Sequence, residues 1–143
     1  MRMVLDTNVL VSALITPGGL PDKLLQHWEA DDFTLVTSSA QLDELLRVLA
    51  YDKLQSYIRP EQAARLMESI RSFAILTGNL PDLNVSSDAA DNLILATAVA
   101  GAASHLVTGD KADLLNLKSV DAVAIITVRE AMQLLQAGPT NGT

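Results

Sequence analysis

Cysteine is absent from the 143-residue sequence, and aromatic residues make up only 3% of it. The lack of cysteine excludes a disulfide framework and a thiolate metal site. Because 49% of the residues are nevertheless hydrophobic, the core must be built from aliphatic side chains. A chain of this length fits one domain with a sizeable core.

Long hydrophobic runs are absent as well. No segment approaches the run of about 18 uncharged apolar residues that suggests a membrane-spanning helix. Asp6 and Asn8 interrupt the apolar N-terminal segment, which is therefore not typical of a signal peptide. From these features we expect a cytoplasmic protein that does not act at a membrane.

Positive charge is scarce, since 10 Lys and Arg residues stand against 17 Asp and Glu residues, for a net charge of −7. A domain that binds nucleic acid through its overall charge should be basic, so this composition argues against a simple nucleic-acid-binding module. It does not argue against an enzyme that reaches phosphate groups through bound divalent cations, because such ions reverse the sign of the charge locally.

Short apolar segments alternate along the chain with segments of helical periodicity. Strands are expected at 3–5, 33–36, 74–77, 105–107 and 123–126. Helical stripes lie between them, one of which consists of Leu42, Leu45, Leu46 and Leu49. The alternation predicts a three-layer α/β/α domain with a mostly parallel sheet of four to five strands. We expect a single domain over 1–137, followed by a disordered tail over 138–143.

Four acidic residues fall near the strand-to-helix junctions of this predicted sheet. Asp6 directly follows the first strand, and Asp110 follows the fourth. Asp91 lies in the first turn of the helix before the fourth strand, and Glu44 lies in the second turn of the helix after the second. Because crossover connections are right-handed, these junctions lie on one edge of the sheet. This is the edge where open α/β sheets bind their ligands.

A group of carboxylates at one edge suggests a metal site. Mg²⁺ and Mn²⁺ prefer such oxygen ligands, whereas zinc is not expected in a chain with only His27 and His105 and no cysteine. Clustered carboxylates also repel one another, which is a further reason to expect a cation among them. Two such ions would activate a water molecule and stabilise the leaving oxygen of a phosphodiester.

The acids also have purely structural explanations. Asp88 is placed to cap a helix, Asp91 to complement the helix dipole, and Asp110 to form a turn. Glu44 lies nearly opposite the leucine stripe, so its pattern alone is that of a solvent-exposed acid. Four residues are supporting candidates because they flank the acids: Asn8, Asp88, Thr108 and Asp113.

Five segments of the chain resemble those of a known family. They are VLDTNVLVSAL at 4–14, SSAQLDELLRVL at 38–49, DAADNLILATA at 88–98, HLVTGD at 105–110 and AIITVREA at 124–131. In this order, they resemble a PIN domain, the nuclease fold of many bacterial toxins in toxin–antitoxin pairs. The resemblance covers nearly the whole chain.

The resemblance implies a ribonuclease that depends on Mg²⁺ or Mn²⁺. Its acidic cluster would consist of Asp6, Glu44, Asp91 and Asp110. It also implies a supporting role for Asn8 and Thr108, an RNA substrate, a homodimer and, for toxin members, an inhibitory antitoxin. The sequence departs from the family near the fourth acid. Related sequences often run G-D-x-D, whereas here one more residue separates Asp110 from Asp113, which leaves open whether Asp113 reaches a metal.

Other functions are compatible with the same pattern. A PIN-like domain that has lost catalysis would act by docking a partner, and a nuclease that cuts DNA would have the same metal ligands. A phosphatase of the haloacid dehalogenase type would use Asp6 as its nucleophile. That chemistry resembles a D-x-D motif, and the second position here is Asn8, which argues against it.

Overall fold

The computed structural model describes residues 1–109 and 111–137. Asp110, the fourth predicted metal ligand, lies outside the described residues. The tail expected to be disordered, 138–143, lies outside them too. The statements below concern the described part of the chain.

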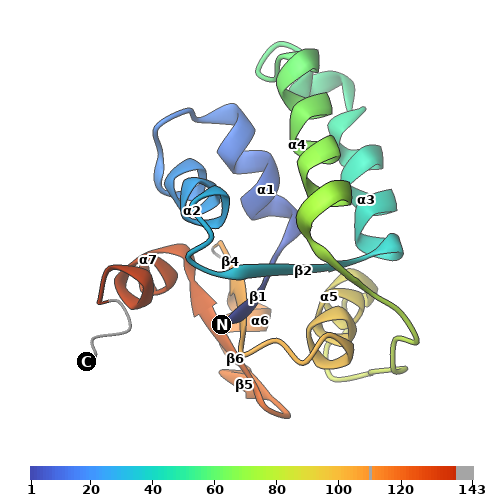
Figure 1. Cartoon of the computed structure of the whole chain (residues 1–143). Helices are drawn as coiled ribbons and strands as arrows, with labels where there is room; N and C mark the ends of the chain where they lie inside the picture. The colour runs from blue at the N-terminus through green and yellow to red at the C-terminus, as the bar shows by residue number, and fades with distance from the viewer. Residues whose placement is uncertain (110, 138–143) are drawn as a thin grey trace.

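A six-stranded sheet forms the centre of the molecule, with strand order β3-β2-β1-β4-β6-β5 (Figure 1). The strands are β1 (Arg2–Leu5), β2 (Thr34–Ser38), β3 (Ile75–Thr77), β4 (His105–Thr108), β5 (Ser119–Val120) and β6 (Val123–Thr127). All neighbouring strands pair in parallel except β5 and β6. The predicted α/β class and mostly parallel sheet are therefore confirmed.

The predicted number of four to five strands was too low, because β5 was not anticipated. This strand has two residues, Ser119 and Val120, and pairs with Ala124 and Val123 in a tight hairpin. Two residues are too few to show the alternation of polar and apolar side chains by which a strand is identified in a sequence.

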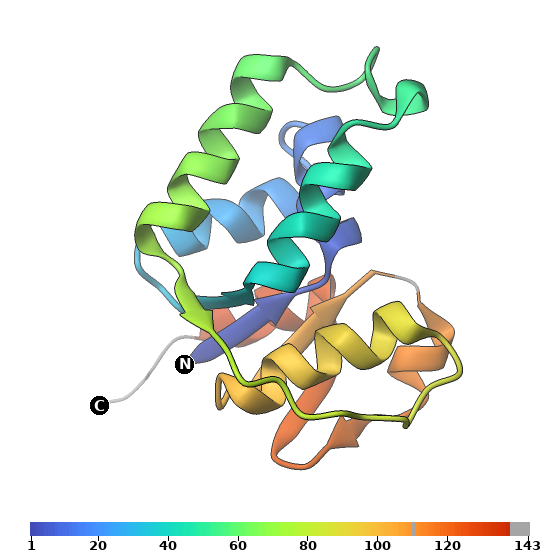
Figure 2. The same ribbon diagram turned by 90° about the vertical axis from the view of Figure 1, so that its right-hand side faces the viewer.

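Helices cover both faces of the sheet (Figure 2). One face carries α1 (Thr7–Ile15), α2 (Leu20–Glu29), α3 (Ser39–Leu49), α4 (Pro60–Phe73) and α7 (Val128–Ala137), while the other carries α5 (Ala89–Ala100) and α6 (Ala112–Leu115). A 3-10 turn (Asp52–Leu54) lies between α3 and α4. Strand β1 has the alternation that two buried faces require, since Met3 and Leu5 pack into one core and Val4 into the other.

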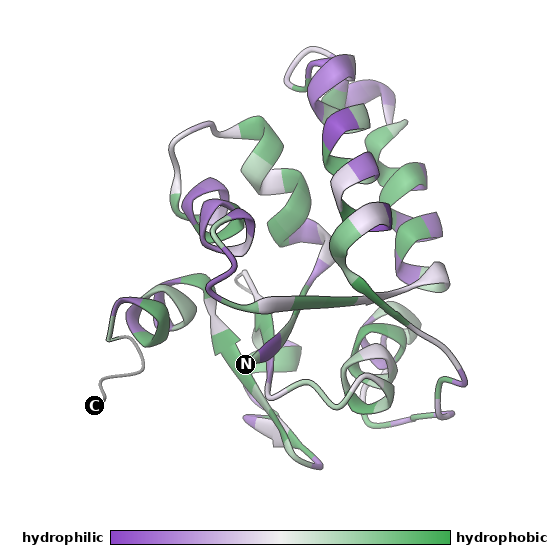
Figure 3. Ribbon diagram, in the orientation of Figure 1, coloured by the Kyte–Doolittle hydropathy of each residue, from purple (hydrophilic) through white to green (hydrophobic). Residues whose placement is uncertain are grey.

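Helices α3 and α4 run antiparallel and extend away from the sheet (Figure 2). Leu42 and Leu45 of α3 are buried, as the leucine stripe predicts. Leu46 of the same stripe is 44% exposed. In Figure 3 the strands are mainly hydrophobic and much of the α4 surface is hydrophilic. Among the described residues, no helix has the length and hydrophobicity needed to cross a membrane.

Candidate active site

Asp6 lies where β1 ends and α1 begins. Its backbone N–H donates to the carbonyl of Val107 at 2.8 Å, and its carbonyl accepts from the N–H of Val9 at 2.9 Å. Asp6 is thus the N-cap residue of α1, yet its side chain makes no capping hydrogen bond. The carboxylate instead accepts a hydrogen bond from the hydroxyl of Thr108, with 2.9 Å between Oγ1 and Oδ2. Thr108 is fully buried, so the Asp6 carboxylate is fixed between β1 and β4.

Glu44 is brought to the same place by a buried glutamine. The Gln41 side chain donates from Nε2 to the carbonyl of Leu5 at 2.6 Å and accepts from the Thr37 hydroxyl at 2.7 Å. This ties the first turn of α3 to the end of β1. One turn later, Glu44 accepts a hydrogen bond from the hydroxyl of Thr7. Glu44 is therefore half-buried beside Asp6, and is not the solvent-exposed acid that its helical position suggested.

Asp91 comes from the opposite face of the sheet, in the first turn of α5, and is only 2% exposed. Its Oδ2 accepts a hydrogen bond from the hydroxyl of Ser86 at 3.2 Å. Ser86 is held in turn by Asn92, whose amide donates to its carbonyl at 2.8 Å and accepts from its N–H at 2.9 Å. The loop before α5 thus folds back on the helix and orients Asp91.

Lys111 connects the acids from the two faces, and sequence reasoning missed this role. Its Nζ lies 3.3 Å from Oδ1 of Asp91 and 3.9 Å from Oδ2 of Asp6. Nothing in the sequence indicated that Gln41, Ser86 and Lys111 would contribute to the site. Only the unusual spacing after Asp110 drew attention to the segment that contains Lys111.

The electrostatics of the site follow from burial. Desolvation raises the pKa of Asp6, although the charge of Lys111 and the hydrogen bond from Thr108 oppose it; Glu44 adds to the increase. Burial by itself would lower the pKa of Lys111. The combined attraction of Asp6 and Asp91 outweighs burial and raises that pKa. The two acids therefore favour a cation between them.

The supporting candidates take different positions. Asp88 is exposed and caps α5, because its Oδ1 accepts from the N–H of Ala90 at 2.9 Å. Asp88 and Asp113 nevertheless face the same hollow of about 230 Å³, which Asp91 and Lys111 also line. Asn8 is exposed in the first turn of α1, and Asp113 is exposed in α6.

A divalent cation fits the chemistry of this site, which offers carboxylate oxygens backed by hydroxyl groups. Asp6 and Asp91 are buried and already share one cation, the Lys111 ammonium. No group of three or more acidic or histidine side chains among residues 1–109 and 111–137 is close enough to hold a metal in this arrangement. Asp110 lies outside the described residues, and the Lys111 ammonium lies near a carboxylate oxygen of each buried acid.

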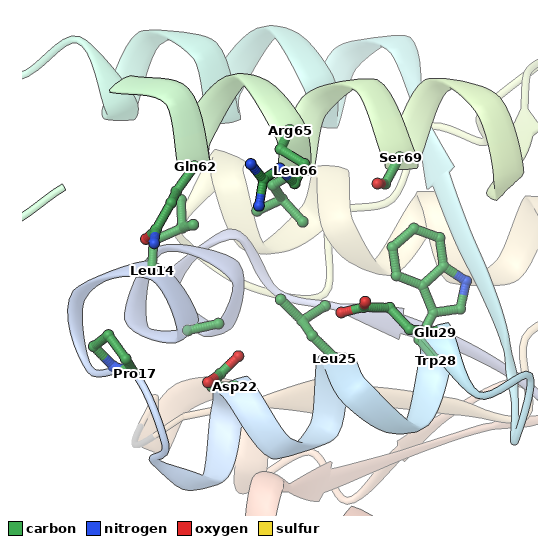
Figure 4. Close-up of a pocket in the computed structure, with 11 residues that line it drawn as sticks. Leu14, Pro17, Asp22, Leu25, Trp28, Glu29, Gln62, Arg65, Leu66 and Ser69 are labelled. Atoms are coloured by element: carbon green, nitrogen blue, oxygen red, sulfur yellow. The ribbon is translucent and has the colours of Figure 1, made fainter. Parts of the chain in front are cut away.

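A separate hollow lies between α2 and α4 and contains none of the predicted site residues (Figure 4). Its volume is about 220 Å³. Leu25 and Trp28 of α2 face Leu66 and Arg65 of α4 across it. The acids that the sequence predicted as the site lie at the carboxyl edge of the sheet and do not line this hollow.

Comparison with known proteins agrees with this fold. The family model described as PIN domain matches residues 2–112, a range that includes Asp6, Glu44 and Asp91 but ends before Asp113. A protein of Methanocaldococcus jannaschii named "Uncharacterized protein MJ1680" is 31% identical over 119 residues, which are 82% of this chain and 76% of that protein. PIN domains form a nuclease superfamily and generally depend on divalent metals. The chain belongs to the PIN domain family.

Proposed function

We propose that this protein is a cytoplasmic endoribonuclease that depends on Mg²⁺ or Mn²⁺ and is the toxin of a toxin–antitoxin pair. One observation carries the proposal. Two buried carboxylates from opposite faces of the sheet, Asp6 and Asp91, come together at the carboxyl edge, where both lie near the Lys111 ammonium. Glu44 is held beside Asp6 by the hydroxyl of Thr7. The preference for RNA, and the expectation of a homodimer inhibited by an antitoxin over the acidic cluster, rest on the resemblance to PIN-domain toxins.

The metal would be held by Asp6, Glu44, Asp91 and Asp110. When bound, it would supply electrostatic stabilisation to the phosphodiester and activate a water molecule. The protein's own part is to fix the carboxylates. Thr108 orients Asp6, Thr7 orients Glu44 and Ser86 orients Asp91. Glu44 is less buried than Asp6 and Asp91, so it is the best placed of these three to accept a proton from water.

A non-catalytic role as a partner-docking module is the second candidate. It is favoured by the position of Lys111, which already offers a positive charge to Asp6 and Asp91. In that case the acids would need no metal, and the protein would keep the fold without the chemistry. The two candidates differ in whether the site binds a divalent ion.

The first test is calorimetric titration of the protein with Mn²⁺, alongside Asp91→Asn and the control Asp82→Asn. Asp82 is exposed in the loop before α5, and its substitution removes the same charge. We expect the unmodified protein and the control to bind, and Asp91→Asn to bind at least about tenfold more weakly, a loss of about 1.4 kcal/mol. Absence of binding at millimolar Mn²⁺ in all three would favour the docking role.

The substrate is tested next, on single-stranded RNA and DNA of the same sequence with Mn²⁺ present. Metal-dependent cleavage of RNA by the unmodified protein and not by Asp91→Asn is the expected result. Cleavage of DNA alone would keep the metal site and replace the proposed substrate.

A further inference from the structure

Lys111 occupies the space between the two buried acids of the proposed metal site. We propose that its ammonium is the resident cation of the metal-free site and that a divalent ion must displace it to bind. The inference rests on the proposed function, because it concerns the metal of that site. It assigns Lys111 a role in metal loading.

The first step of the argument is geometric. The ammonium lies 3.3 Å from a carboxylate oxygen of Asp91 and 3.9 Å from one of Asp6, and the side chains of these acids are only 3% and 5% exposed. Mg²⁺ binds its oxygen ligands at about 2.0–2.1 Å. A divalent ion bound by these two acids would therefore compete with the ammonium for the same carboxylate oxygens. Two cations that share this space repel each other strongly, because little water is present to screen them.

The second step is that Lys111 has somewhere to go. Its side chain is 32% exposed, and the ammonium group stands at the end of a flexible four-carbon stem. The adjoining hollow of about 230 Å³ is lined by Lys111 itself and by the exposed acids Asp88 and Asp113. An ammonium that leaves Asp6 and Asp91 can move toward these two carboxylates and remain neutralised in contact with solvent.

The third step concerns the state without metal. Asp6 and Asp91 without a cation would be two buried carboxylates that repel each other. Lys111 offsets part of this penalty in the metal-free protein. The same contact must be broken when the metal binds, which lowers the observed metal affinity. Lys111 thus sets the concentration at which the site is loaded.

The test is calorimetric titration with Mn²⁺ of three variants, Lys111→Met, Lys111→Arg and Lys53→Met. Lys53 is an exposed lysine of the 3-10 turn, so Lys53→Met corrects for the loss of one positive charge. We expect Lys111→Met to bind Mn²⁺ about tenfold more tightly than the unmodified protein, a gain of about 1.4 kcal/mol. Lys111→Arg, which keeps the charge, and Lys53→Met should both stay close to the unmodified protein.

The outcomes separate this inference from the proposed function. Equal or weaker binding by Lys111→Met, with binding still lost in Asp91→Asn, would overturn the displacement of Lys111 and leave the metal site intact. No binding by any variant, Lys111→Met included, would overturn both.

A second measurement uses the unmodified protein and so does not depend on the folding of a variant. Lysine acylation by a reactive ester is followed by peptide mass spectrometry, without Mg²⁺ and with saturating Mg²⁺. The rate at Lys111 should rise several-fold with Mg²⁺ when compared with the rate at Lys53. An unchanged ratio means that the ammonium stays in place, contrary to the proposal.

Discussion

At the scale of single residues, the site brings together charged groups, Asp6, Asp91 and Lys111, whose burial would each destabilise the fold without the others. Asp6 is buried at the end of a core strand, and its side chain accepts a hydrogen bond from Thr108. Its raised pKa means that the folded protein disfavours the ionised form. Residues of this kind are usually retained for function, since replacing them tends to stabilise the fold.

We therefore expect Asp6→Asn to increase the free energy of unfolding of the metal-free protein by about 1 kcal/mol at neutral pH. The Asn carbonyl can still accept from Thr108. The sign follows from linkage. A group whose pKa is raised by folding contributes stability that is fully present below its ordinary pKa of 3.8 and is lost as the pH rises through the raised value.

The advantage of Asp6→Asn should thus grow as the pH rises from 3.8 toward neutrality and then stay constant. Urea unfolding of both proteins over this range, with a chelator present, measures the difference. A difference that shrinks with rising pH would mean that Asp6 is better stabilised as an anion than its burial indicates.

At the scale of secondary-structure elements, α5 carries Asp91 and must be seated closely against the sheet. Gly101 at its C-terminal end is where the helix approaches β2. A Cβ at this position would lie 2.3 Å from Cγ1 of Val36, which is fully buried. The φ of Gly101 is −85°, which any residue can adopt, so the requirement for glycine here is one of space.

We expect Gly101→Ala to destabilise the protein by about 1–3 kcal/mol, the usual effect of overpacking a filled core. The matched control is Gly78→Ala, because a Cβ at Gly78 would meet nothing within 4 Å. Chemical denaturation of the two variants measures the effect. If both lose the same amount, helix seating is not the cause. Because the same helix carries Gly101 at its C-terminal end and Asp91 in its first turn, a shift of α5 in Gly101→Ala should also weaken Mn²⁺ binding at Asp91.

At the scale of the whole molecule, binding of a divalent ion should increase the stability of the fold as well as supply chemistry. The reason is that the chain has a net charge of −7 and gathers carboxylates at one edge of the sheet. A ligand that binds the folded but not the unfolded chain stabilises it by about 2.7 kcal/mol at a concentration of 100 times its Kd. The acids are brought together only by folding, so the unfolded chain has no comparable site.

Saturating Mn²⁺ should accordingly raise the Tm of the unmodified protein by roughly 10 °C, given the usual relation between unfolding free energy and Tm. Asp91→Asn should show little change. A scanning calorimetry series with NaCl at matched ionic strength controls for simple screening of the negative charge. An equal rise in Asp91→Asn would assign the effect to diffuse binding over the acidic surface.

The sequence alone determined the features of this protein that depend on neighbours along the chain. Apolar segments alternating with helical segments predicted the α/β class, and their junctions predicted that Asp6, Glu44, Asp91 and Asp110 would lie at one edge of the sheet. The handedness of parallel connections is nearly invariant, so a local pattern was enough to predict a shared edge. The two-residue strand β5 was missed because it is too short to carry a period.

Only the tertiary structure decided which side chains complete the site. Lys111 meets Asp91 across 20 positions of sequence, and Gln41 meets Leu5 across 36. Thr7 meets Glu44 across 37, and this contact brings a half-buried acid of the helix surface close to the buried Asp6. Each contact depends on how α3 and the segment after β4 pack on the sheet. The hydrophobic period of a helix indicates which of its faces is buried. It does not indicate which distant residue a side chain of that helix will contact.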